Sequence, residues 1–591
     1  MDLTWLLLSL VALASIHPSP CAGRRLERIH ALPDGWEQLD DGAPQPSAPF
    51  RLSVALRQPQ VHELRRRVAA GRVPASDIKA LRQPAPEDVE VVRRWLRDGG
   101  IAEAAAAEKN GWIHVDTTVG AAEKLLDMQL RRYSFRGGHP VLRSREYSVP
   151  DSLAPMIHFV HPVANFVAPR PLRALSRLGT SGRRAASKPS CFSCAAEVVP
   201  KCILRKYNIS YTPPDGKSSI RLGVPGFLEQ FANFEDTQKF LRRTRPNLTK
   251  TGYNFSVELA NGGSNSQAKS EAGQEADADV QYTMAIGYPA QVVFYSIGGQ
   301  STKLDDRGRP TPQQEPPDPF NANEPYVQLL EFLLDKPDDE IPHVLSLSYG
   351  DDEISVPRRY AERVCDMIGM LTARGTSFIG GSGDGGARGA RNATCRTNDG
   401  TDRDVAIATF PATCPWVTSV GAVTNARDAK GADFSTGGFS QIFKRESWQD
   451  EAVDGYVKAL DGYLENLYDP AMRAIPDISV VGTEYFNIIG GKEGFSNGTS
   501  LSTPVFAAMI ALVNDARVRK GKDVLGWLND KLYSDKVRSV LKDVTGGQSQ
   551  SCILADGSEP GGWPAKEGWD AITGLGTPDN FDDLLRVLVD M

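Results

Sequence analysis

Histidine is almost missing from the C-terminal two-thirds of this chain. Of its eight histidines in 591 residues, seven lie before residue 162, and only His343 follows. A serine nucleophile in this region would therefore need either His343 or a carboxylate as its general base. This scarcity makes chemistry based on histidine the weaker hypothesis.

Cysteine is also scarce. Eight residues are few for this length, so the fold is not expected to depend on them. In an oxidising compartment some should pair. We expect Cys395 to pair with Cys414, because they bracket a Gly/Asp/Asn-rich loop, and Cys202 to pair with Cys194 or Cys191. The Cys191–Cys194 spacing predicts no metal or redox site, because no second such pair and no histidines lie nearby.

No run of about 18 apolar residues follows the N-terminus, so we expect no membrane span. Residues 1–23 are predicted to be a secretory signal peptide, because Trp5–Ala14 is apolar but too short to cross a bilayer. Cleavage could follow Ala14 or Gly23. Five glycosylation sequons follow residue 200 and favour the secretory route. They begin at Asn208, Asn247, Asn254, Asn392 and Asn497. We expect an extracellular protein, with a lysosome or vacuole as the alternative.

Length and charge indicate two units. A chain of 591 residues is too long for one ordinary domain, and 41% hydrophobic with 24% charged residues is globular. Residues 24–200 carry 27 Lys and Arg against 19 Asp and Glu, whereas residues 201–591 carry 40 against 53. Opposite net charges predict that the two parts dock on each other. We expect a monomer with no nucleic-acid partner.

Residues 24–165 are predicted to form a small α+β domain of antiparallel sheet and helices. Helical periodicity runs through Val61–Ala70, Pro86–Asp98 and Val119–Leu130, with extended stretches such as Trp112–Thr118 and His139–Tyr147 between them. Residues 166–195 are rich in Pro, Ser and basic side chains without an apolar period. They are expected to be a linker and a site of proteolytic processing.

The remaining chain, residues 196–591, alternates strands with helices. Several strand candidates are continuously apolar, as buried parallel strands are. The candidates are Gln291–Ile297, His343–Ser348, Thr376–Gly380, Trp416–Val423 and Ile478–Val481, with helices over Tyr326–Leu334, Arg358–Arg374 and Thr503–Asp515. This pattern predicts an α/β fold with a parallel sheet that is covered by helices on both faces.

Two carboxylates stand four residues apart at Glu275 and Asp279. If residues 270–287 begin with a helix, both lie on one face, where like charges cost stability unless they are used. The alternative is an acidic, solvated helix face that also carries Asp277.

Asp384 follows the strand candidate Thr376–Gly380 in the segment Ser382-Gly383-Asp384-Gly385. Ligands of parallel α/β sheets bind beyond the carboxyl ends of the strands. Asp384 is therefore a candidate ligand-binding or catalytic group, with an Asx-turn as the alternative.

Ser500 follows Gly498-Thr499 and precedes the apolar stretch Val505–Val513. The small residues permit a tight strand-to-helix turn that presents the hydroxyl at a helix N-terminus. The alternative is that Ser500 or Ser502 caps a helix that begins at Thr503.

Taken together, these segments resemble the signature of the sedolisins, or serine-carboxyl peptidases, which are acid proteases with a subtilisin-like fold. The family pattern is Glu-x-x-x-Asp, then Ser-Gly-Asp, then Ser-Gly-Thr-Ser-x-Ser-Thr-Pro, and this chain meets it in that order. The resemblance covers about residues 195–591, while residues 24–165 resemble the family's propeptide more loosely. Further motifs that carry it are Ser348–Asp352, Phe410–Ala412, Trp416–Gly421 and Gly437–Ser440.

The resemblance implies a role for each of four residues. Ser500 would be the nucleophile, Glu275 its general base, Asp279 the group that orients Glu275, and Asp384 the oxyanion-hole side chain. A carboxylate is a usable base below pH 6. Asp384 can donate to an oxyanion only when it is protonated. Both demands point to acid pH. Leu501 departs from the usual alanine, which puts the shape of a subsite in doubt rather than activity.

The C-terminal segment resembles the family's calcium site. The resemblance implies Ca²⁺ ligands from the side chains of Asp543 and Asp570 and from main-chain oxygens of Val544, Lys566 and Gly568.

We therefore predict a secreted acid peptidase made as a proenzyme, which releases tripeptides from free N-termini through an acyl-enzyme on Ser500. The segment Tyr349–Glu353 is close to the tripeptidyl-peptidase branch, and an acidic cleft end could hold a substrate amino terminus. Its partners would be peptide substrates and its own propeptide, whose docking low pH would weaken. The alternatives are an acid endopeptidase of the same family, a Ser-His-Asp hydrolase that uses His343, and an inactive secreted binding protein.

Overall fold

The N-terminal domain is built on antiparallel sheets. The computed structural model describes residues 23–591 except 34, 136, 138–139, 167–169, 172–173, 179–193, 195–196, 299–324, 390–394, 398–400 and 402. The predicted signal peptide thus lies outside the described residues. The domain's elements are β1 (Gly23–Arg28), β2 (Trp36–Gln38), β3 (Pro49–Leu56), α1 (Leu64–Ala70), α2 (Ala75–Leu81), α3 (Pro86–Asp98), β4 (Ala106–Lys109), β5 (Trp112–Thr118), α4 (Val119–Leu126), β6 (Arg131–Phe135), β7 (Val141–Arg143), β8 (Glu146–Pro150) and β9 (Ile157–His161).

Its largest sheet has four antiparallel strands in the order β4-β5-β3-β9. Two predicted elements, α3 and β5, have the expected bounds. Helix α4 is shorter than predicted: it ends at Leu126 because Asp127 adopts a left-handed conformation, with φ of 44°. The α+β character expected of residues 24–165 is confirmed.

The C-terminal domain centres on a seven-stranded, wholly parallel sheet of order β13-β14-β12-β15-β17-β19-β22. These strands are β12 (Arg221–Gly226), β13 (Ser256–Ala260), β14 (Gln291–Ile297), β15 (Val344–Leu347), β17 (Ser377–Gly381), β19 (Val417–Val423) and β22 (Ile478–Val481). The helices are α5 (Pro200–Lys206), α6 (Phe234–Thr244), α7 (Pro246–Thr249), α8 (Gln274–Gly287), α9 (Pro325–Leu334), α10 (Arg358–Ala373), α11 (Asp450–Leu460), α12 (Thr499–Arg519), α13 (Asn529–Leu532), α14 (Asp535–Arg538) and α15 (Phe581–Asp590). Shorter pairings involve β10 (Arg170–Pro171), β11 (Ala174–Leu178), β16 (Tyr349–Asp352), β18 (Thr409–Phe410), β20 (Gly438–Lys444), β21 (Met472–Ile475), β23 (Tyr485–Ile489), β24 (Lys492–Asn497), β25 (Leu541–Lys542) and β26 (Thr577–Pro578).

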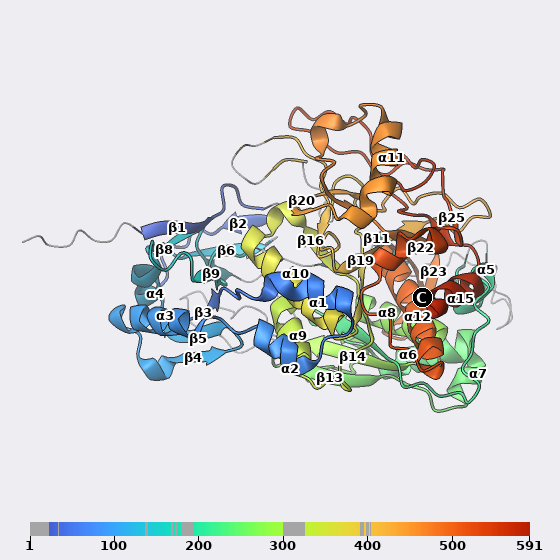
Figure 1. Ribbon diagram of the computed structural model, residues 1–591, viewed down its shortest axis with the longest axis horizontal. Coiled ribbons are helices and arrows are strands. Elements are labelled where there is room, and N and C mark those ends of the chain that lie inside the picture. The colour runs from blue at the N-terminus through green and yellow to red at the C-terminus, as the bar shows by residue number, and fades with distance from the viewer. Residues whose placement is uncertain are drawn as a thin grey trace, which may run out of the picture.

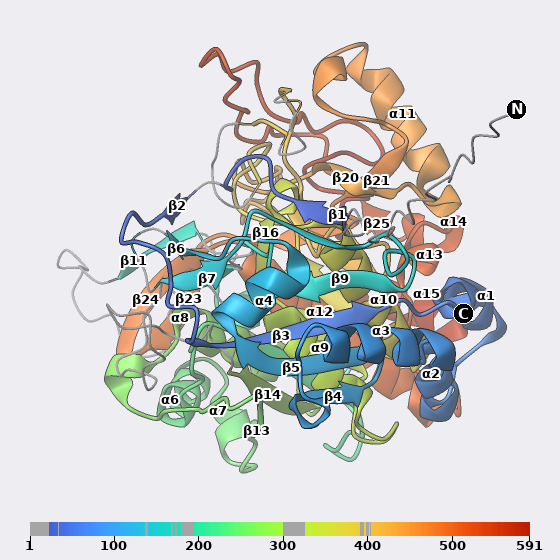
Figure 2. The ribbon, with the colours of Figure 1, turned by 90° about the vertical axis from the view of Figure 1, so that its left-hand side faces the viewer.

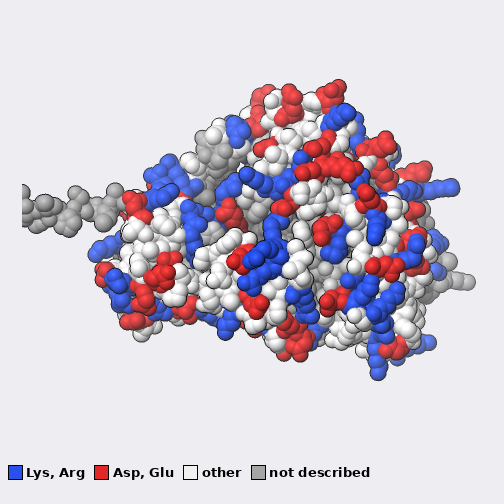
Figure 3. Space-filling model, in the orientation of Figure 1, with Lys and Arg blue, Asp and Glu red and all other residues white. Residues whose placement is uncertain are grey.

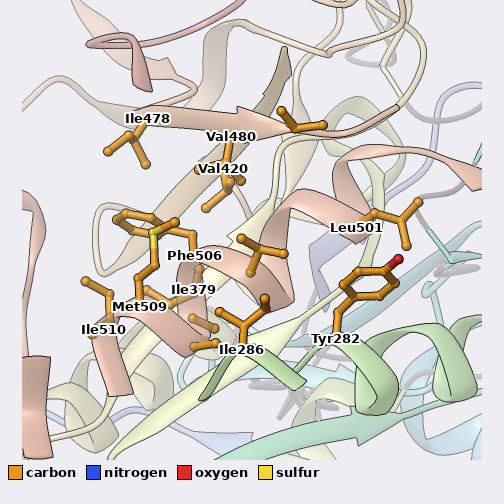
Figure 4. Close-up of a cluster of buried hydrophobic side chains, with 14 of the residues drawn as sticks. Tyr282, Ile286, Ile379, Val420, Ile478, Val480, Leu501, Phe506, Met509 and Ile510 are labelled. Carbon is orange, nitrogen blue, oxygen red and sulfur yellow. The ribbon is translucent and has the colours of Figure 1, made fainter. Parts of the chain in front are cut away.

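Both faces of this sheet are buried, which explains the continuous apolar runs of the sequence. Along β14, Val292 and Phe294 enter the cluster that contains α8 and α12, while Val293 and Tyr295 enter the cluster that contains α9 and α10. Figure 4 shows the first cluster, where α12 side chains such as Phe506 meet strand residues of β17, β19 and β22. The prediction of a parallel sheet with helices on both faces is confirmed.

Helix α12 is the central helix of this core. Its length and composition would suit a membrane span, but 94% of its apolar window is buried inside the protein. It begins at Thr499 rather than at the expected Thr503. Neither Ser500 nor Ser502 caps it, because its N-cap is Gly498, so the capping alternative is wrong.

The N-terminal domain packs against α9 and α10 of the C-terminal domain. Figure 1 shows it at the left, with α1 beside α10, and Figure 2 views the molecule from that side. One hydrophobic cluster crosses the boundary and joins Leu64 and Ile78 to Leu330 and Ile368. On the face shown in Figure 3 acidic and basic side chains are interspersed over both domains. The ion pairs between the domains join basic side chains of the N-terminal domain to acidic side chains of the C-terminal domain, as the opposite net charges predict.

The most buried of these ion pairs is formed by Arg82 of the N-terminal domain. Its guanidinium pairs with Glu331 of α9 and lies 3.5 Å from Asp335, and its side chain is only 4% exposed. Trp112 Nε1 donates to Glu331 Oε1 at 2.9 Å, and Lys109 Nζ lies 2.5 Å from Asp335.

The disulfides correct one expectation. Cys194 pairs with Cys202, which was one of the two alternatives. Cys395 pairs with Cys552 and Cys414 with Cys365, so the predicted Cys395–Cys414 bridge is wrong. The prediction used proximity in sequence, whereas the fold brings Cys395 beside a segment 157 residues away.

Candidate active site

The two carboxylates of α8 are buried rather than solvated. Glu275 is 1% exposed, and Asp277 and Asp279 are fully buried. Helix α8 leaves the carboxyl-end side of the sheet and packs along α12, so its first turns lie inside the domain. The alternative of a solvated acidic face is therefore wrong.

Ser348 links Asp279 to Ser500. Its hydroxyl oxygen lies 3.0 Å from Asp279 Oδ1 and 3.3 Å from the carbonyl oxygen of Ser500. Ser348 directly follows β15, and Ser500 lies in the first turn of α12, so the two elements converge at this end of the sheet. Ser500 is 1% exposed.

Glu275 lies in the same group, one helical turn before Asp279. Its backbone N–H donates to Gln230 Oε1 at 3.1 Å, which fixes the start of α8. Burial raises the pKa of Tyr349, and the charges of Glu275 and Asp279 add to this. Tyr349 therefore lies within electrostatic reach of both carboxylates.

Asp384 is held against the residue that precedes Ser500. Asp384 Oδ1 accepts hydrogen bonds from Thr499 N at 2.8 Å and from Thr499 Oγ1 at 2.9 Å. Gly383 permits this approach, because its φ is 116° and a Cβ there would lie 2.8 Å from side-chain atoms of Thr409 and Thr436. The four predicted catalytic residues thus come from α8, α12 and the loop after β17, and meet beyond the carboxyl ends of the strands.

His343 lies at the other end of the sheet. It immediately precedes β15, whereas Ser348 immediately follows it, so roughly 16 Å separates the two backbones at about 3.3 Å per residue. Its Nδ1 accepts from Arg221 N at 3.0 Å, and burial lowers its pKa to about 4. The hypothesis of a Ser-His-Asp hydrolase that uses His343 is therefore wrong.

Two short strands of the predicted linker pair with strands next to the candidate site. In β10, Arg170 pairs with Gly350 and Pro171 with Tyr349, both antiparallel. In β11, residues 174–178 pair antiparallel with β24, and Ala174 pairs with Asn497, three residues before Ser500. The described linker residues of β10 and β11 thus lie in extended, antiparallel pairing with strands that adjoin Ser348 and Ser500.

The residues that resemble a calcium site surround one loop. Asp543 Oδ2 accepts from Gly568 N at 2.7 Å, and Asp570 Oδ2 accepts from Lys566 N at 3.3 Å. Asp570 is fully buried, and burial raises its pKa to about 7. In the described part of the chain, no three His, Cys, Asp or Glu side chains are grouped for a metal ion. The donor set of two carboxylates and carbonyl oxygens around one loop nevertheless fits a hard cation.

Sequence reasoning assigned no role to Ser348 or Thr499. Both lie in motifs that carried the resemblance, so the signal was present, but nothing in the sequence showed that they contact Asp279 and Asp384. Those contacts join segments 69 and 115 residues apart.

Comparisons with known proteins find relatives along almost the whole chain. A family model described as Pro-kumamolisin, activation domain, matches residues 35–166, and one described as Subtilase family matches residues 320–549. Tripeptidyl-peptidase SED3 of Arthroderma otae is 34% identical over 96% of this chain and 96% of its own length. Tripeptidyl-peptidase sed4 of Aspergillus fumigatus is 36% identical over 94% of each chain. Among solved structures, a Pseudomonas sedolisin complexed with two molecules of pseudo-iodotyrostatin matches with a TM-score of 0.47 and 19% identity, and covers 66% of this chain and 97% of that one.

Proposed function

Because this chain belongs to the sedolisin family of serine-type peptidases, we propose that it is a secreted, acid-active tripeptidyl-peptidase made as a proenzyme. The observation that carries the proposal is the chain of contacts from Asp279 through Ser348 to Ser500, with Asp384 held on Thr499 beside it. It connects the buried carboxylate of Asp279 to the backbone of Ser500, and places the carboxyl group of Asp384 on the preceding residue, without a histidine.

The reaction proceeds in two steps. Ser500 Oγ attacks the carbonyl carbon of the third peptide bond while Glu275 takes the hydroxyl proton. Asp279, fixed by Ser348, orients Glu275. The tetrahedral oxyanion accepts a hydrogen bond from protonated Asp384. The C–N bond then breaks, and Glu275 returns the proton to the leaving amine. Water hydrolyses the resulting ester by the same route and regenerates Ser500.

The pairing of β10 supports removal of tripeptides. A substrate that binds β16 antiparallel, as Arg170 and Pro171 do, runs upstream toward Asp351 and Asp352. Both side chains are buried at this end of the strand. A substrate ammonium group there gains charge-assisted hydrogen bonds. The names of the relatives favour the same mode.

Maturation removes the N-terminal domain. We assign residues 24–165 as the propeptide, residues 166–195 as the processing linker and residues 196–591 as the catalytic domain. The extended pairing of β10 and β11 on either side of Ser500 supports processing within this linker. Docking on α9 and α10 supports a propeptide that assists folding, and the pairing of β10 with β16 and of β11 with β24 supports one that covers the site until it is removed.

The C-terminal loops could be stabilised by a bound calcium ion. Asp543, Asp570 and the carbonyl oxygens of Val544, Lys566 and Gly568 would hold it. A bound cation would offset the cost of burying the Asp570 carboxylate. Its role is structural, because these residues lie outside the group around Ser500.

The experiment compares the full-length protein with its Ser500→Ala variant across pH 3–7. Mass spectrometry follows cleavage in residues 166–195, and peptide reporters with free and with blocked N-termini measure turnover. Processing and tripeptide release at acid pH, both lost in the variant, are the expected result. Equal cleavage of the blocked reporter would replace the tripeptidyl assignment with an endopeptidase. A processed protein that is inert at every pH would favour the inactive binding protein.

A further inference from the structure

We propose that Thr499 is a positioning residue for this reaction: its amide and hydroxyl hold one oxygen of Asp384, so that the other oxygen carries the proton donated to the oxyanion. This inference rests on the proposed role of Asp384. It concerns how the side chain of Asp384 is held, which neither the comparisons nor the motif describes.

The hydrogen bonds around Thr499 fix the direction of its hydroxyl. Gly383 N donates to Thr499 Oγ1 at 3.1 Å, so one lone pair of that oxygen is used. The single hydroxyl proton is then directed to Asp384 Oδ1, 2.9 Å away. Thr499 is fully buried, so water does not compete for these bonds.

Two donors on one carboxyl oxygen decide where the proton of Asp384 lies. Oδ1 accepts from both Thr499 N and Thr499 Oγ1, at 2.8 and 2.9 Å. If Oδ1 carried the proton, its O–H would face two donors and could not form a hydrogen bond with either of them. The proton therefore resides on Oδ2. When Asp384 is protonated, Thr499 thus decides which of its two oxygens carries the proton, and it also holds the side chain in place.

The same contacts couple Asp384 to the nucleophile. Thr499 and Ser500 are consecutive residues in the first turn of α12, so a shift of the helix start moves the nucleophile and the oxyanion donor together. Charged residues on the adjoining elements include Glu275 and Asp279 on α8, which packs on α12, Asp351 and Asp352 on β16, which contacts β17, and Arg388 four residues after Asp384. The substitutions described next leave all of them unchanged.

The test compares Thr499→Val, which removes the hydroxyl at constant shape, with Thr499→Ser, which retains it. Thr503→Val is the matched control, because Thr503 is equally buried but its hydroxyl donates to the Thr499 carbonyl oxygen. We expect kcat of Thr499→Val to fall about 10- to 100-fold with little change in KM, less than loss of an entire oxyanion donor. Thr499→Ser and Thr503→Val should stay near the parent.

The pH profile separates positioning from a merely structural role. The Thr499 hydroxyl stabilises the charged form of Asp384, so its removal keeps Asp384 protonated to higher pH. The alkaline limb of kcat in Thr499→Val should therefore move up by about one pH unit. An unmoved limb, or an equal loss of kcat in Thr503→Val, would overturn the proposal. If Thr499→Val does not fold, Thr499→Ala repeats the measurement.

A double-mutant cycle with Asp384→Ala separates this proposal from the proposed function. If Thr499 acts through Asp384, adding Thr499→Val to Asp384→Ala causes no further loss of kcat. Additive losses would refute the positioning role while leaving Asp384 essential. If Asp384→Ala retains full activity, the role of Asp384 itself fails, and the Thr499 proposal fails with it.

Discussion

Arg82 should control how tightly the N-terminal domain stays docked. Its buried guanidinium faces Glu331 of α9 and Asp335, which directly follows α9. Truncation to alanine removes this positively charged partner from both carboxylates. Removing one partner of a buried, hydrogen-bonded charge pair costs about 2–5 kcal/mol. That range corresponds to a Kd between roughly 30 and 5,000 times higher. Partial exposure of Glu331, at 21%, favours the lower part of the range.

The assay uses the Ser500→Ala protein, nicked with trypsin in the basic linker so that the domains are held together by docking alone. Size-exclusion chromatography after serial dilution gives the Kd with and without Arg82→Ala. Arg51→Ala is the control, because Arg51 pairs with Asp116 within the N-terminal domain and both side chains are more than two-thirds exposed. Such a pair contributes about 1 kcal/mol or less. Equal Kd values for Arg82→Ala and the parent would refute the assignment of Arg82 as the anchor.

Three further predictions follow from the site and the interface. Glu275→Gln should lower kcat about 10²- to 10⁴-fold through loss of the base, and near-parental turnover would remove Glu275 from the mechanism. Burial lowers the pKa of His161 to about 3, with Arg143 and His114 adding to the shift. The neutral ring stacks on Tyr360, so its contribution to docking is present above about pH 6.5 and is lost as the pH falls toward 3. At pH 5 the nicked parent complex should therefore dissociate more readily than the nicked His161→Phe complex. Equal dissociation of the two would contradict this. Chelation should lower the Tm of the parent but not of Asp570→Asn, because only the parent binds Ca²⁺; equal shifts would exclude this site.

Some parts of the fold follow from local sequence. The runs Gln291–Ile297 and Ile478–Val481 are mostly apolar, with Ser296 and Ser479 as their buried polar residues, and both strands have the predicted bounds. Helix α3 also has the predicted bounds, because Pro86 and two acidic residues mark its start and Gly99 follows its end. In contrast, β12 was missed, because Gly223, Pro225 and Gly226 interrupt its apolar pattern. Glycines fit there because Leu345, Tyr295 and Phe294 occupy the space of a Cβ.

The proposed catalytic groups could be named from the sequence alone, because Ser500, Glu275 and Asp279 lie in short local motifs whose spacing on a helix or turn follows from backbone geometry. Tertiary structure alone decided how these groups meet. Ser348 reaches Asp279 across 69 residues and Cys395 reaches Cys552 across 157, and both contacts depend on how strands and helices stack. Burial likewise depends on the assembled core. Because α8 packs along α12, Glu275 and Asp279 are buried carboxylates near Ser500 rather than part of a solvated helix face.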